Sequence, residues 1–441
     1  DRYLFQANVR HDGSSRFAKG YRWGTFPSFS AGWVASEEKF MKNLKWDWLS
    51  FLKLRGSWGM LGNERIGSNY FPYIALMSFG NSLFYMADGS VVSDKTARPA
   101  VLAVEDITWE TTTSTDLGLD VNFLNNRLQF HFDYYWKETK DMLLNIEIPY
   151  FMGYNNPSTN AGKMSTHGYD IEVAWNDQIG DFKYGVNVNF SDFLSKIDYM
   201  NDGEQISGGK IKRAGVLFNE FYGYVCEGIY QTQEEVNNSA RTSTTVTVGD
   251  LKYRDISGPD GVPDGVISPE YDRVPLGNSL PRFQYGGSLN ASYKGIDFSL
   301  AFQGIGKQNS YLSTSMVQPL RDNYGNVPAI LEGKYWSPFN TTEENLAAKY
   351  PRLSNVSKSN NYATSNFWMF NGSYFRLKNI TLGYTLPKSW TQKAGINRAR
   401  FYVSGSDLFC LSNFPSGWDP EMGTSDYPIT TSLVMGIQVN F

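Results

Sequence analysis

The sequence predicts an all-β protein, a transmembrane antiparallel β-barrel to which this chain supplies about twelve strands with long extracellular loops. Three observations predict it: aromatic and glycine enrichment, repeated two-residue alternation, and long connections gathered on one side. The 441 residues include 28 Tyr, 29 Phe, 12 Trp and 41 Gly. No stretch approaches the roughly 18 consecutive apolar residues of a membrane helix. This composition is typical of membrane barrels, in which only alternate residues meet lipid.

The alternation is clearest at residues 127–137. Phe130, Phe132 and Tyr134 share one face there, whereas His131 and Asp133 share the other. We predict that the aromatic face meets lipid, because strand residues two apart point the same way. Twelve strands are predicted, near 1–11, 20–35, 50–61, 112–123, 127–141, 165–176, 182–197, 281–293, 295–306, 372–384, 399–410 and 431–441.

The connections between these strands distinguish a membrane barrel from a soluble sandwich. If the last strand ends on the periplasmic side, all short and medium links fall on that side, at 36–49, 125–126, 177–181, 294–295 and 385–398. The long segments fall on the other side, at 62–111, 142–164, 198–280, 307–371 and 411–430. Long loops outside and short turns inside are typical of bacterial outer-membrane barrels. We expect 198–280 to be a long extracellular loop insertion with an acidic Gly/Asp-rich turn.

Several motifs carry a resemblance to a known family. They are Asp12-Gly13-Ser14-Ser15-Arg16-Phe17, Arg22-Trp23-Gly24-Thr25-Phe26-Pro27-Ser28, Leu54-Arg55-Gly56-Ser57-Trp58-Gly59, Gly249-Asp250-Leu251-Lys252-Tyr253-Arg254-Asp255 and Phe375-Arg376-Leu377-Lys378-Asn379-Ile380-Thr381-Leu382-Gly383-Tyr384-Thr385-Leu386-Pro387. Together they resemble the starch-utilisation-system C family (SusC/RagA-like) of TonB-dependent outer-membrane transporters of Bacteroidetes. The matches run in family order from about residue 3 to Phe441.

The resemblance implies active import of nutrients through a 22-stranded barrel in the bacterial outer membrane. Oligosaccharides are the favoured substrate class, and oligopeptides are the alternative. It also implies a plug domain, energy from TonB–ExbB–ExbD through an N-terminal segment, and a SusD-like surface lipoprotein as a lid. Because the chain opens on a predicted strand at Tyr3, we expect the plug, the TonB-binding segment and about ten strands to lie outside this sequence. The N-terminal part of the same barrel and membrane lipid are then further partners.

Candidate substrate contacts are loop aromatics and polar residues on the wet strand faces. Ring faces stack on sugar C–H surfaces and also bind peptide side chains, so they suit either ligand. The alternative is that these residues pack loops, grip the lid or hydrogen-bond within the wall. The candidates are Tyr85, Tyr154, Tyr222, Trp336, Trp368, Trp418, Arg55 and Glu172. We predict that Trp336, Trp368 and Trp418 lie on the extracellular side.

An acidic turn is the candidate metal site. From Asp260, an Asp at position five, a Gly at six and an apolar residue at eight match a calcium-binding loop, whereas Val262 and Tyr271 at positions three and twelve depart from it. Pro259 and Pro263 also depart from the family's usual form. The candidate ligands are Asp255, Asp260, Asp264, Glu270 and Asp272. A metal-free turn rich in Gly, Asp and Pro is the alternative, and no other cofactor is expected.

Other function classes find little support in the sequence. The three His lack metal-ligand spacing, no nucleophile elbow or phosphate loop is present, and an enzyme is not expected. A net charge of −4 does not favour binding to the negatively charged backbone of nucleic acid. Cys226 and Cys410 are predicted to be two free thiols, with a disulfide as the alternative. The remaining alternatives are a passive porin-like channel, an outer-membrane enzyme and a soluble carbohydrate-binding β protein.

One strand carries a local irregularity. Phe375 and Leu377 share one parity, but Ile380 and Leu382 share the other. Since the side-chain period of a strand is two, the pleat must slip between them. We predict a β-bulge near Lys378 or Asn379.

Overall fold

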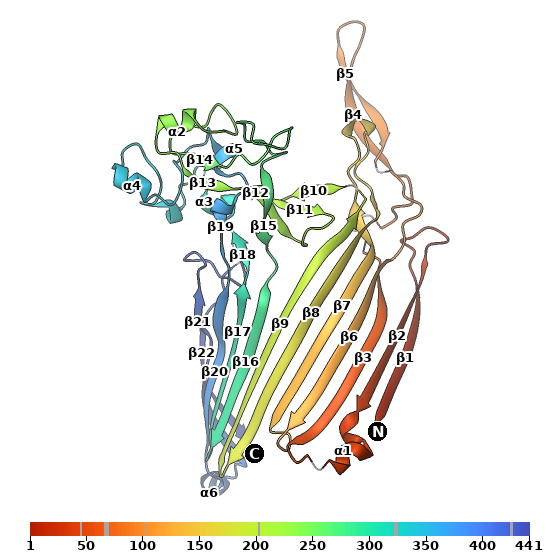
Figure 1. Cartoon of the computed structure of the whole chain (residues 1–441), viewed down its shortest axis with the longest axis vertical. Coiled ribbons are helices and arrows are strands. Elements are labelled where there is room, and N and C mark those ends of the chain that lie inside the picture. The colour runs from red at the N-terminus through yellow and green to blue at the C-terminus, as the bar shows by residue number, and fades with distance from the viewer. Residues whose placement is uncertain (45, 66–69, 101, 202, 322–324, 424–426) are drawn as a thin grey trace. The chain divides into compact units, whose positions relative to one another are not determined.

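The structure, a computed structural model, describes residues 1–441 except 45, 66–69, 101, 202, 322–324 and 424–426. Its main element is a sheet of twelve strands in which sequence neighbours pair (Figure 1). The strands are β1 (Tyr3–Gly13), β2 (Trp23–Val34), β3 (Leu49–Asn63), β6 (Glu110–Phe123), β7 (Leu128–Asn145), β8 (Ser158–Ile179), β9 (Phe182–Met200), β16 (Arg282–Tyr293), β17 (Ile296–Lys307), β20 (Tyr374–Thr385), β21 (Arg398–Ser412) and β22 (Ser432–Asn440). All twelve predicted strands are confirmed.

The pairing register explains the predicted aromatic face. Phe130, Phe132 and Tyr134 of β7 lie opposite Val121, Leu119 and Leu117 of β6. Such cross-strand apolar pairs stabilise one face of a sheet. The three aromatic side chains are half-buried by their strand neighbours rather than packed in a closed interior. The face is therefore apolar and open, as the prediction for residues 127–137 requires.

The chain divides into two compact units. Unit 1 comprises Asp1–Val173, Phe193–Gln205 and Arg213–Leu217. Its short connections contain η1 (Ala35–Glu37), α1 (Lys39–Asn43) and the turn 124–127, and its longer ones contain a hairpin of β4 (Met77–Tyr85) and β5 (Val91–Pro99), and η2 (Tyr150–Met152). A small hydrophobic cluster consists of Phe17, Phe26, Ile107 and Trp109. It packs residues of the connections before β2 and before β6 against β2 itself.

Unit 2 comprises Ala174–Asp192, Ile206–Lys212 and Phe218–Phe441. Its short connections are 180–181, 294–295 and 386–397, the last with α6 (Lys388–Thr391) and η5 (Gln392–Ala394). Its long connections hold many small elements: β12 (Glu220–Tyr224), β13 (Cys226–Ile229), α2 (Gln233–Asn237), β14 (Leu251–Tyr253), β15 (Arg273–Asn278), β18 (Asn309–Tyr311), α3 (Thr314–Val317), η3 (Ala329–Leu331), α4 (Thr342–Leu346), α5 (Lys358–Asn361), η4 (Asn366–Trp368) and β19 (Met369–Asn371). β10 (Glu204–Ser207) and β11 (Lys210–Arg213) lie where the chain passes between the units.

The small elements of unit 2 share their own hydrophobic core. We call this cluster the loop core: Tyr224, Leu251, Tyr253, Ile267, Met316, Val317, Leu331 and Trp368. The elements gather beyond the ends of β16, β17 and β20 (Figure 1). In both units the long connections therefore leave one end of the strands, which we call the long-connection end. The longest connections of each unit leave this end, as predicted, but unit 1 is not sorted strictly by length: the connections 14–22 and 146–157 at this end are shorter than the connection 35–48 at the other.

The predicted bulge is also confirmed, at Lys378. On one side Ala301 pairs with Asn379 and Phe302 with Leu377, so Lys378 is skipped. On the other side the pairing again passes from Leu377 to Asn379. One unpaired residue is enough to shift the pleat by one position.

Two further features bear on the predictions. Among the described residues, no helix has the length and apolar character needed to cross a membrane. Cys226 and Cys410 are both free thiols, as predicted. Burial raises the pKa of the Cys226 thiol to about 11, so this thiol stays protonated and unreactive at neutral pH.

Candidate functional site

Arg55 lies in an ion cluster on the polar face of unit 1. Its Nη2 donates to Asp133 Oδ2 at 2.6 Å, and its Nε lies 3.3 Å from both carboxylate oxygens of Asp120. Its Nη1 is 3.6 Å from Asp116 Oδ1. A Cβ on Gly118 would lie 2.4 Å from Arg55 Cζ, so the guanidinium needs glycine there. Three carboxylates surround Arg55. Its guanidinium is therefore paired within the barrel wall, which is the alternative given for it, and is not free to contact a ligand.

The other candidates in unit 1 are more accessible. Tyr85 ends β4 in the hairpin and is 83% exposed. Tyr154 lies half-buried in the connection between β7 and β8, and Glu172 is exposed on β8. The structure does not bring these three side chains together with Arg55. Their substrate role stays a prediction.

The tryptophans of unit 2 lie at the long-connection end, the end that is predicted to be extracellular. Trp368 belongs to the loop core, is 2% exposed, and its Nε1 donates to the Asn361 carbonyl oxygen at 2.8 Å. Trp336 is buried, and its Nε1 donates to Gln231 Oε1 at 3.2 Å. Tyr222 is buried in β12 beneath the guanidinium of Arg273. These three side chains pack the loops, which is the alternative given for them, and their substrate role stays a prediction.

Trp418 differs from the other two tryptophans. It lies in the connection between β21 and β22, packs against the loop core and remains partly exposed. Of the three it is the one whose ring can still offer surface to a ligand. It is therefore the strongest aromatic candidate in unit 2.

A buried polar centre holds the loop core together. The Asp250 carboxylate is fully buried and accepts hydrogen bonds from Arg352 Nε at 2.7 Å and Asn361 Nδ2 at 2.9 Å. It also accepts from the backbone N–H of Thr247 at 2.9 Å. Gly249 has φ +86°, and a Cβ there would lie 2.3 Å from the Trp336 ring. The Gly-Asp pair of this motif is thus a packing and hydrogen-bonding device, which its sequence alone does not reveal.

Burial also changes the pKa values of tyrosines around this core. Burial raises the pKa of Tyr311 to about 12 and raises that of Tyr362 still further, with a smaller contribution from the Asp250 charge. Both hydroxyls therefore stay neutral at physiological pH. They act as hydrogen-bonding and packing groups and carry no charge to a ligand.

The acidic turn uses its carboxylates mainly on its own backbone. Asp272 is fully buried and accepts from the N–H groups of Ile256 and Ser268, each at 2.7 Å. Asp255 Oδ2 accepts from Gly265 N–H at 2.7 Å, whereas its buried Oδ1 has no hydrogen-bond partner among the described residues. Within the part of the chain that the structure describes, no three His, Cys, Asp or Glu side chains form a metal-binding group. Asp260, Asp264 and Glu270 are not gathered with them, and calcium binding stays a prediction.

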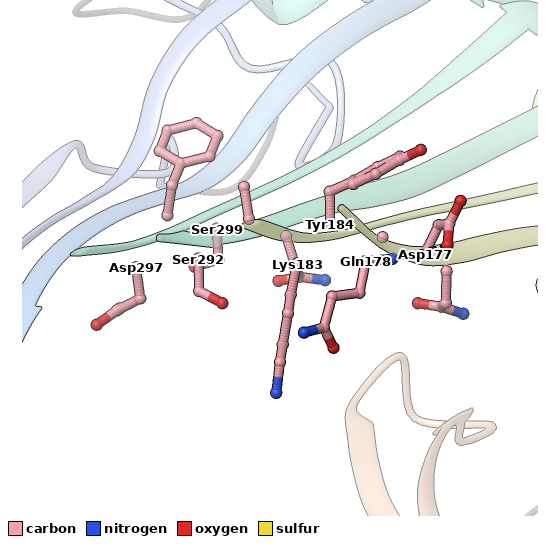
Figure 2. Close-up of a pocket in the computed structure, with 12 residues that line it drawn as sticks. Asp177, Gln178, Lys183, Tyr184, Ser292, Asp297 and Ser299 are labelled. Carbon is pink, nitrogen blue, oxygen red and sulfur yellow. Dashed lines mark hydrogen bonds between the residues drawn. The ribbon is translucent and has the colours of Figure 1, made fainter. Parts of the chain in front are cut away.

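A polar hollow lies at the opposite, short-turn end of unit 2. Lys183, Gln178 and Asp297 project to one side of the sheet there, and Tyr184 projects to the other (Figure 2). Arg400 of β21 reaches across the intervening strand β20, and its Nε donates to Asp297 Oδ1 of β17 at 2.9 Å. This alternation continues the wet and apolar faces of the strands to their short-turn ends.

Residues 1–404 match the family described as TonB dependent receptor-like, beta-barrel. The chain belongs to this family. TonB-dependent receptor barrels are outer-membrane proteins, and the receptor lies in that membrane. Its relatives are receptors and transporters, and it is not an enzyme.

Curated relatives confirm the resemblance to the SusC-like group. The receptor is 30% identical to TonB-dependent receptor P3 of Formosa agariphila, over 100% of this chain and 44% of that protein. It is 29% identical to TonB-dependent receptor SusC of Bacteroides thetaiotaomicron, over 100% of this chain and 42% of that protein. The chain therefore spans less than half the length of these relatives.

The fold is also similar to that of a solved structure, the RagAB peptide transporter. The TM-score is 0.79 at 24% sequence identity, covering 100% of the receptor chain and 46% of that chain. A second RagAB structure, in its closed-closed state, gives a TM-score of 0.78 at 23% identity over the same share of each chain. At this identity the likeness establishes the fold.

Proposed function

We propose that the receptor chain is the C-terminal part of an active outer-membrane importer of nutrients, energised by TonB–ExbB–ExbD. The observation that carries the proposal is the family match over residues 1–404, on an antiparallel sheet of twelve strands. The chain spans 44% of the relative from Formosa agariphila. The plug, the TonB-binding segment and the remaining strands, to reach the implied 22, would belong to the rest of the protein.

Oligosaccharides are the favoured substrate class. Support comes from exposed aromatic rings at the long-connection end, including Tyr85, Phe151 and the partly exposed Trp418. Such rings offer flat apolar surface with little conformational entropy to lose, which suits stacking on sugar rings. Oligopeptides are the second candidate, since the RagAB structure with the same fold is described as a peptide transporter.

A SusD-like surface lipoprotein is the proposed lid. The hairpin of β4 and β5 carries Phe79, Leu83 and Tyr85 largely exposed. A two-stranded hairpin with uncovered apolar residues is marginally stable in water, so it gains stability if a partner covers it. An obligate interface of this kind should bury more than about 2,000 Å². Substrate would then be enclosed between lid, loops and plug.

Uptake by cells that produce the full-length receptor and its lipoprotein tests the proposal. Fluorescent oligosaccharides and oligopeptides are supplied separately, with and without TonB. We expect TonB-dependent entry of oligosaccharides and co-purification of the lipoprotein in mild detergent. Entry that continues without TonB would instead establish a passive channel, and entry of peptides alone would reverse the substrate preference.

A matched pair of variants refines the uptake experiment. Tyr85→Ala removes an exposed ring at the long-connection end, whereas Phe401→Ala removes an exposed ring from the apolar face of β21. We expect Tyr85→Ala alone to reduce oligosaccharide uptake. Equal effects of both variants would point to a general disturbance of the barrel.

We also propose calcium binding at the acidic turn, supported by the unpartnered buried Oδ1 of Asp255. Calcium takes oxygen ligands, and a bound ion would stabilise the turn by mass action, by about 2.7 kcal/mol at a hundredfold excess over its dissociation constant. Calcium should raise the melting temperature of the full-length receptor, and Asp255→Asn should abolish the rise. If calcium does not raise the melting temperature of the wild-type protein, the turn is metal-free and the proposal fails.

A further inference from the structure

Two cations, Arg376 and Lys378, lie at the β-bulge of β20. In a regular strand Arg376 and Lys378 already share a face, but the skipped residue frees Lys378 from the ladder on both sides. The opposite strand is irregular at the same level, where Asp407 has φ +51° and has no partner in the pairing between Ser406 and Phe409. A non-glycine residue in this conformation is held there by its surroundings. Lys378 Nζ lies 2.8 Å from Asp407 Oδ1.

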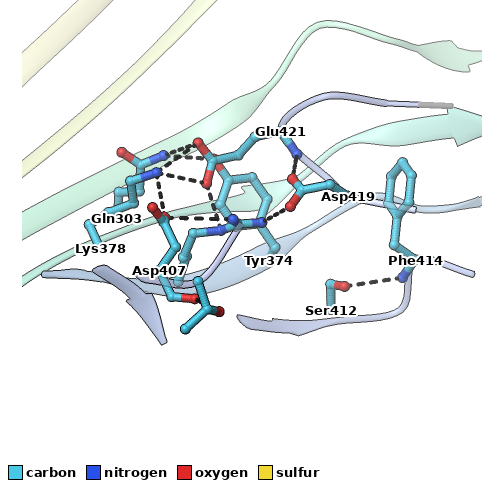
Figure 3. A network of polar contacts seen from close by, with 10 residues as sticks. Gln303, Tyr374, Lys378, Asp407, Ser412, Phe414, Asp419 and Glu421 are labelled. Atoms are coloured by element: carbon cyan, nitrogen blue, oxygen red, sulfur yellow. Dashed lines mark hydrogen bonds and ion pairs between the residues drawn. The ribbon is translucent and has the colours of Figure 1, made fainter. Parts of the chain in front are cut away.

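Arg376 contacts three carboxylates, those of Asp407, Asp419 and Glu421, which converge in one network (Figure 3). Its side chain is 3% exposed. Its Nη2 donates to Asp419 Oδ2 at 2.6 Å, its Nε lies 2.7 Å from Glu421 Oε1, and its Nη1 lies 3.6 Å from Asp407 Oδ1. Removing one partner from such a buried charge group leaves an uncompensated charge, which is strongly unfavourable. The network is therefore cooperative.

The carboxylates come from a different part of the chain than the cations. Asp419 and Glu421 belong to the connection between β21 and β22, within the run Trp418-Asp419-Pro420-Glu421. Glu421 Oε2 also accepts from Gln303 Nε2 of β17 at 2.8 Å. Asp419 Oδ1 accepts from the Glu421 N–H at 2.9 Å, which closes the segment into a tight turn. Two wall strands, β17 and β20, thus hold one short loop segment.

A second tie fixes the far end of the same connection. Thr431 Oγ1 donates to the carbonyl oxygen of Asp407 at 2.9 Å. The residue that receives this bond is the one whose carboxylate meets Lys378 and Arg376. The connection is therefore fastened at both ends to the irregular part of β20 and β21.

We propose that Arg376 and Lys378 are positioning residues that clamp the loop segment 418–421 to the wall and so hold the Trp418 ring in place against the loop core. The main-chain neighbour of Asp419 is Trp418, so immobilising the carboxylate also restricts the ring. The Trp418 ring would then be held ready to contact the transported molecule. This contact alone rests on the proposed function. The β-bulge contributes to this arrangement, because Lys378, unpaired in the strand ladder, contacts Asp407 and Glu421 instead.

The electrostatics of the loop group agree with this geometry. Burial by itself raises the pKa of the Asp419 carboxyl, but the hydrogen bond from Arg376, the backbone hydrogen bonds from Glu421 and Met422 and the charge of Arg376 together outweigh burial, and the pKa lies below its ordinary value. Asp419 is therefore ionised at neutral pH, when the clamp is closed.

Hydrogen exchange on the full-length receptor with its partner, in mild detergent, tests the clamp. The variant is Arg376→Gln, and the matched control is Arg400→Gln. Arg400 also pairs with a carboxylate on the wall, Asp297, but this pair contains no residue of the connection between β21 and β22. We expect exchange in peptides covering 413–423 to become roughly ten- to a hundredfold faster in Arg376→Gln and to stay unchanged in Arg400→Gln.

Residue-level labelling by hydroxyl radicals gives a second, independent measurement. Labelling of Trp418 should rise several-fold in Arg376→Gln, and Arg376→Lys should restore it only in part, because lysine cannot bridge three carboxylates. Unchanged exchange or unchanged Trp418 labelling in Arg376→Gln would overturn the proposal. So would an equal effect of Arg400→Gln, which would show general loosening of the wall.

Ligand binding separates this proposal from the proposed function. If wild-type receptor binds oligosaccharide, Arg376→Gln and Trp418→Ala should weaken binding to a similar degree. If wild-type receptor binds neither oligosaccharide nor oligopeptide, the proposed function fails, while exchange and labelling still decide the clamp.

Discussion

The two units connect their strands at the long-connection end in physically different ways. In unit 1 the hairpin of β4 and β5 is exposed on both faces, with Phe79 80% exposed. In unit 2 the connecting segments form a core of their own, in which Leu251 is 1% exposed. Low burial leaves a segment free to move or to be covered, whereas a packed core makes it a fixed structure. One region is therefore suited to bind a partner, and the other to hold residues in place.

The comparison predicts its largest difference for single aromatic truncations. Trp368→Ala should destabilise the loop core by about 3–5 kcal/mol, because it removes a fully packed indole and leaves a cavity. Phe79→Ala in the hairpin should change stability by less than about 0.5 kcal/mol, because its ring is already in water. Limited proteolysis of the detergent-solubilised receptor, with cleavage mapped by mass spectrometry, measures both. Equal resistance of the two variants would break the distinction between the regions.

A buried carboxylate should matter next most. Asp250→Asn keeps the shape of the side chain but removes the charge that meets Arg352, at an expected loss of about 1.5–3 kcal/mol. Asp94 in β5 is exposed, and Asp94→Asn serves as the control. Hydrogen exchange of peptides around residues 247–253 reports the loss. A neutral result for Asp250→Asn would mean that apolar packing alone holds the loop core.

Two glycines with nearly the same backbone conformation sharpen the comparison. Gly249 has φ +86° and Gly89, in the hairpin turn, has φ +83°. A Cβ on Gly249 would meet the Trp336 ring at 2.3 Å, but a Cβ on Gly89 would meet nothing within 4 Å. Both alanine variants carry backbone strain, and Gly249→Ala adds a clash that we expect to contribute about 1–3 kcal/mol more. Melting curves of the two variants should differ by this clash alone.

The smallest expected effect depends on pH. Because the folded pKa of Asp419 is lowered, its contribution to stability is present above its unfolded pKa of about 3.9 and is lost as pH falls through the folded value. The protection of 413–423 from exchange, taken relative to the intrinsic exchange rate at each pH, should therefore fall as the pH is lowered from about 5 towards 3. Asp419→Asn should remove this response, since no proton is then taken up at that position. A response that survives in Asp419→Asn would assign the titration to another carboxylate.

The strand wall was predictable because its signal is local. Residues two apart in a strand lie on the same face and meet the same environment. The faces of β7 and the shift of the pleat at Lys378 are therefore predictable from a few consecutive residues. The polar role of Arg55 was visible in the same way, although its three carboxylate partners come from β6 and β7. The loop aromatics gave no such signal. Trp336 and Trp368 look like available rings in the sequence and prove to be buried, whereas Trp418 stays partly exposed.

By itself, the sequence determined the twelve strands, their alternating faces, the end of the strands that the longest connections leave and the β-bulge. Only the tertiary structure decided which loop residues are packed and which are available. The physical reason is the distance along the chain over which burial is settled. The backbone N–H of Leu251 donates to Asn361 Oδ1 across 110 residues, and Arg376 meets Asp419 across 43. A strand pattern repeats every two residues, but partners so far apart become neighbours only when the whole unit has folded.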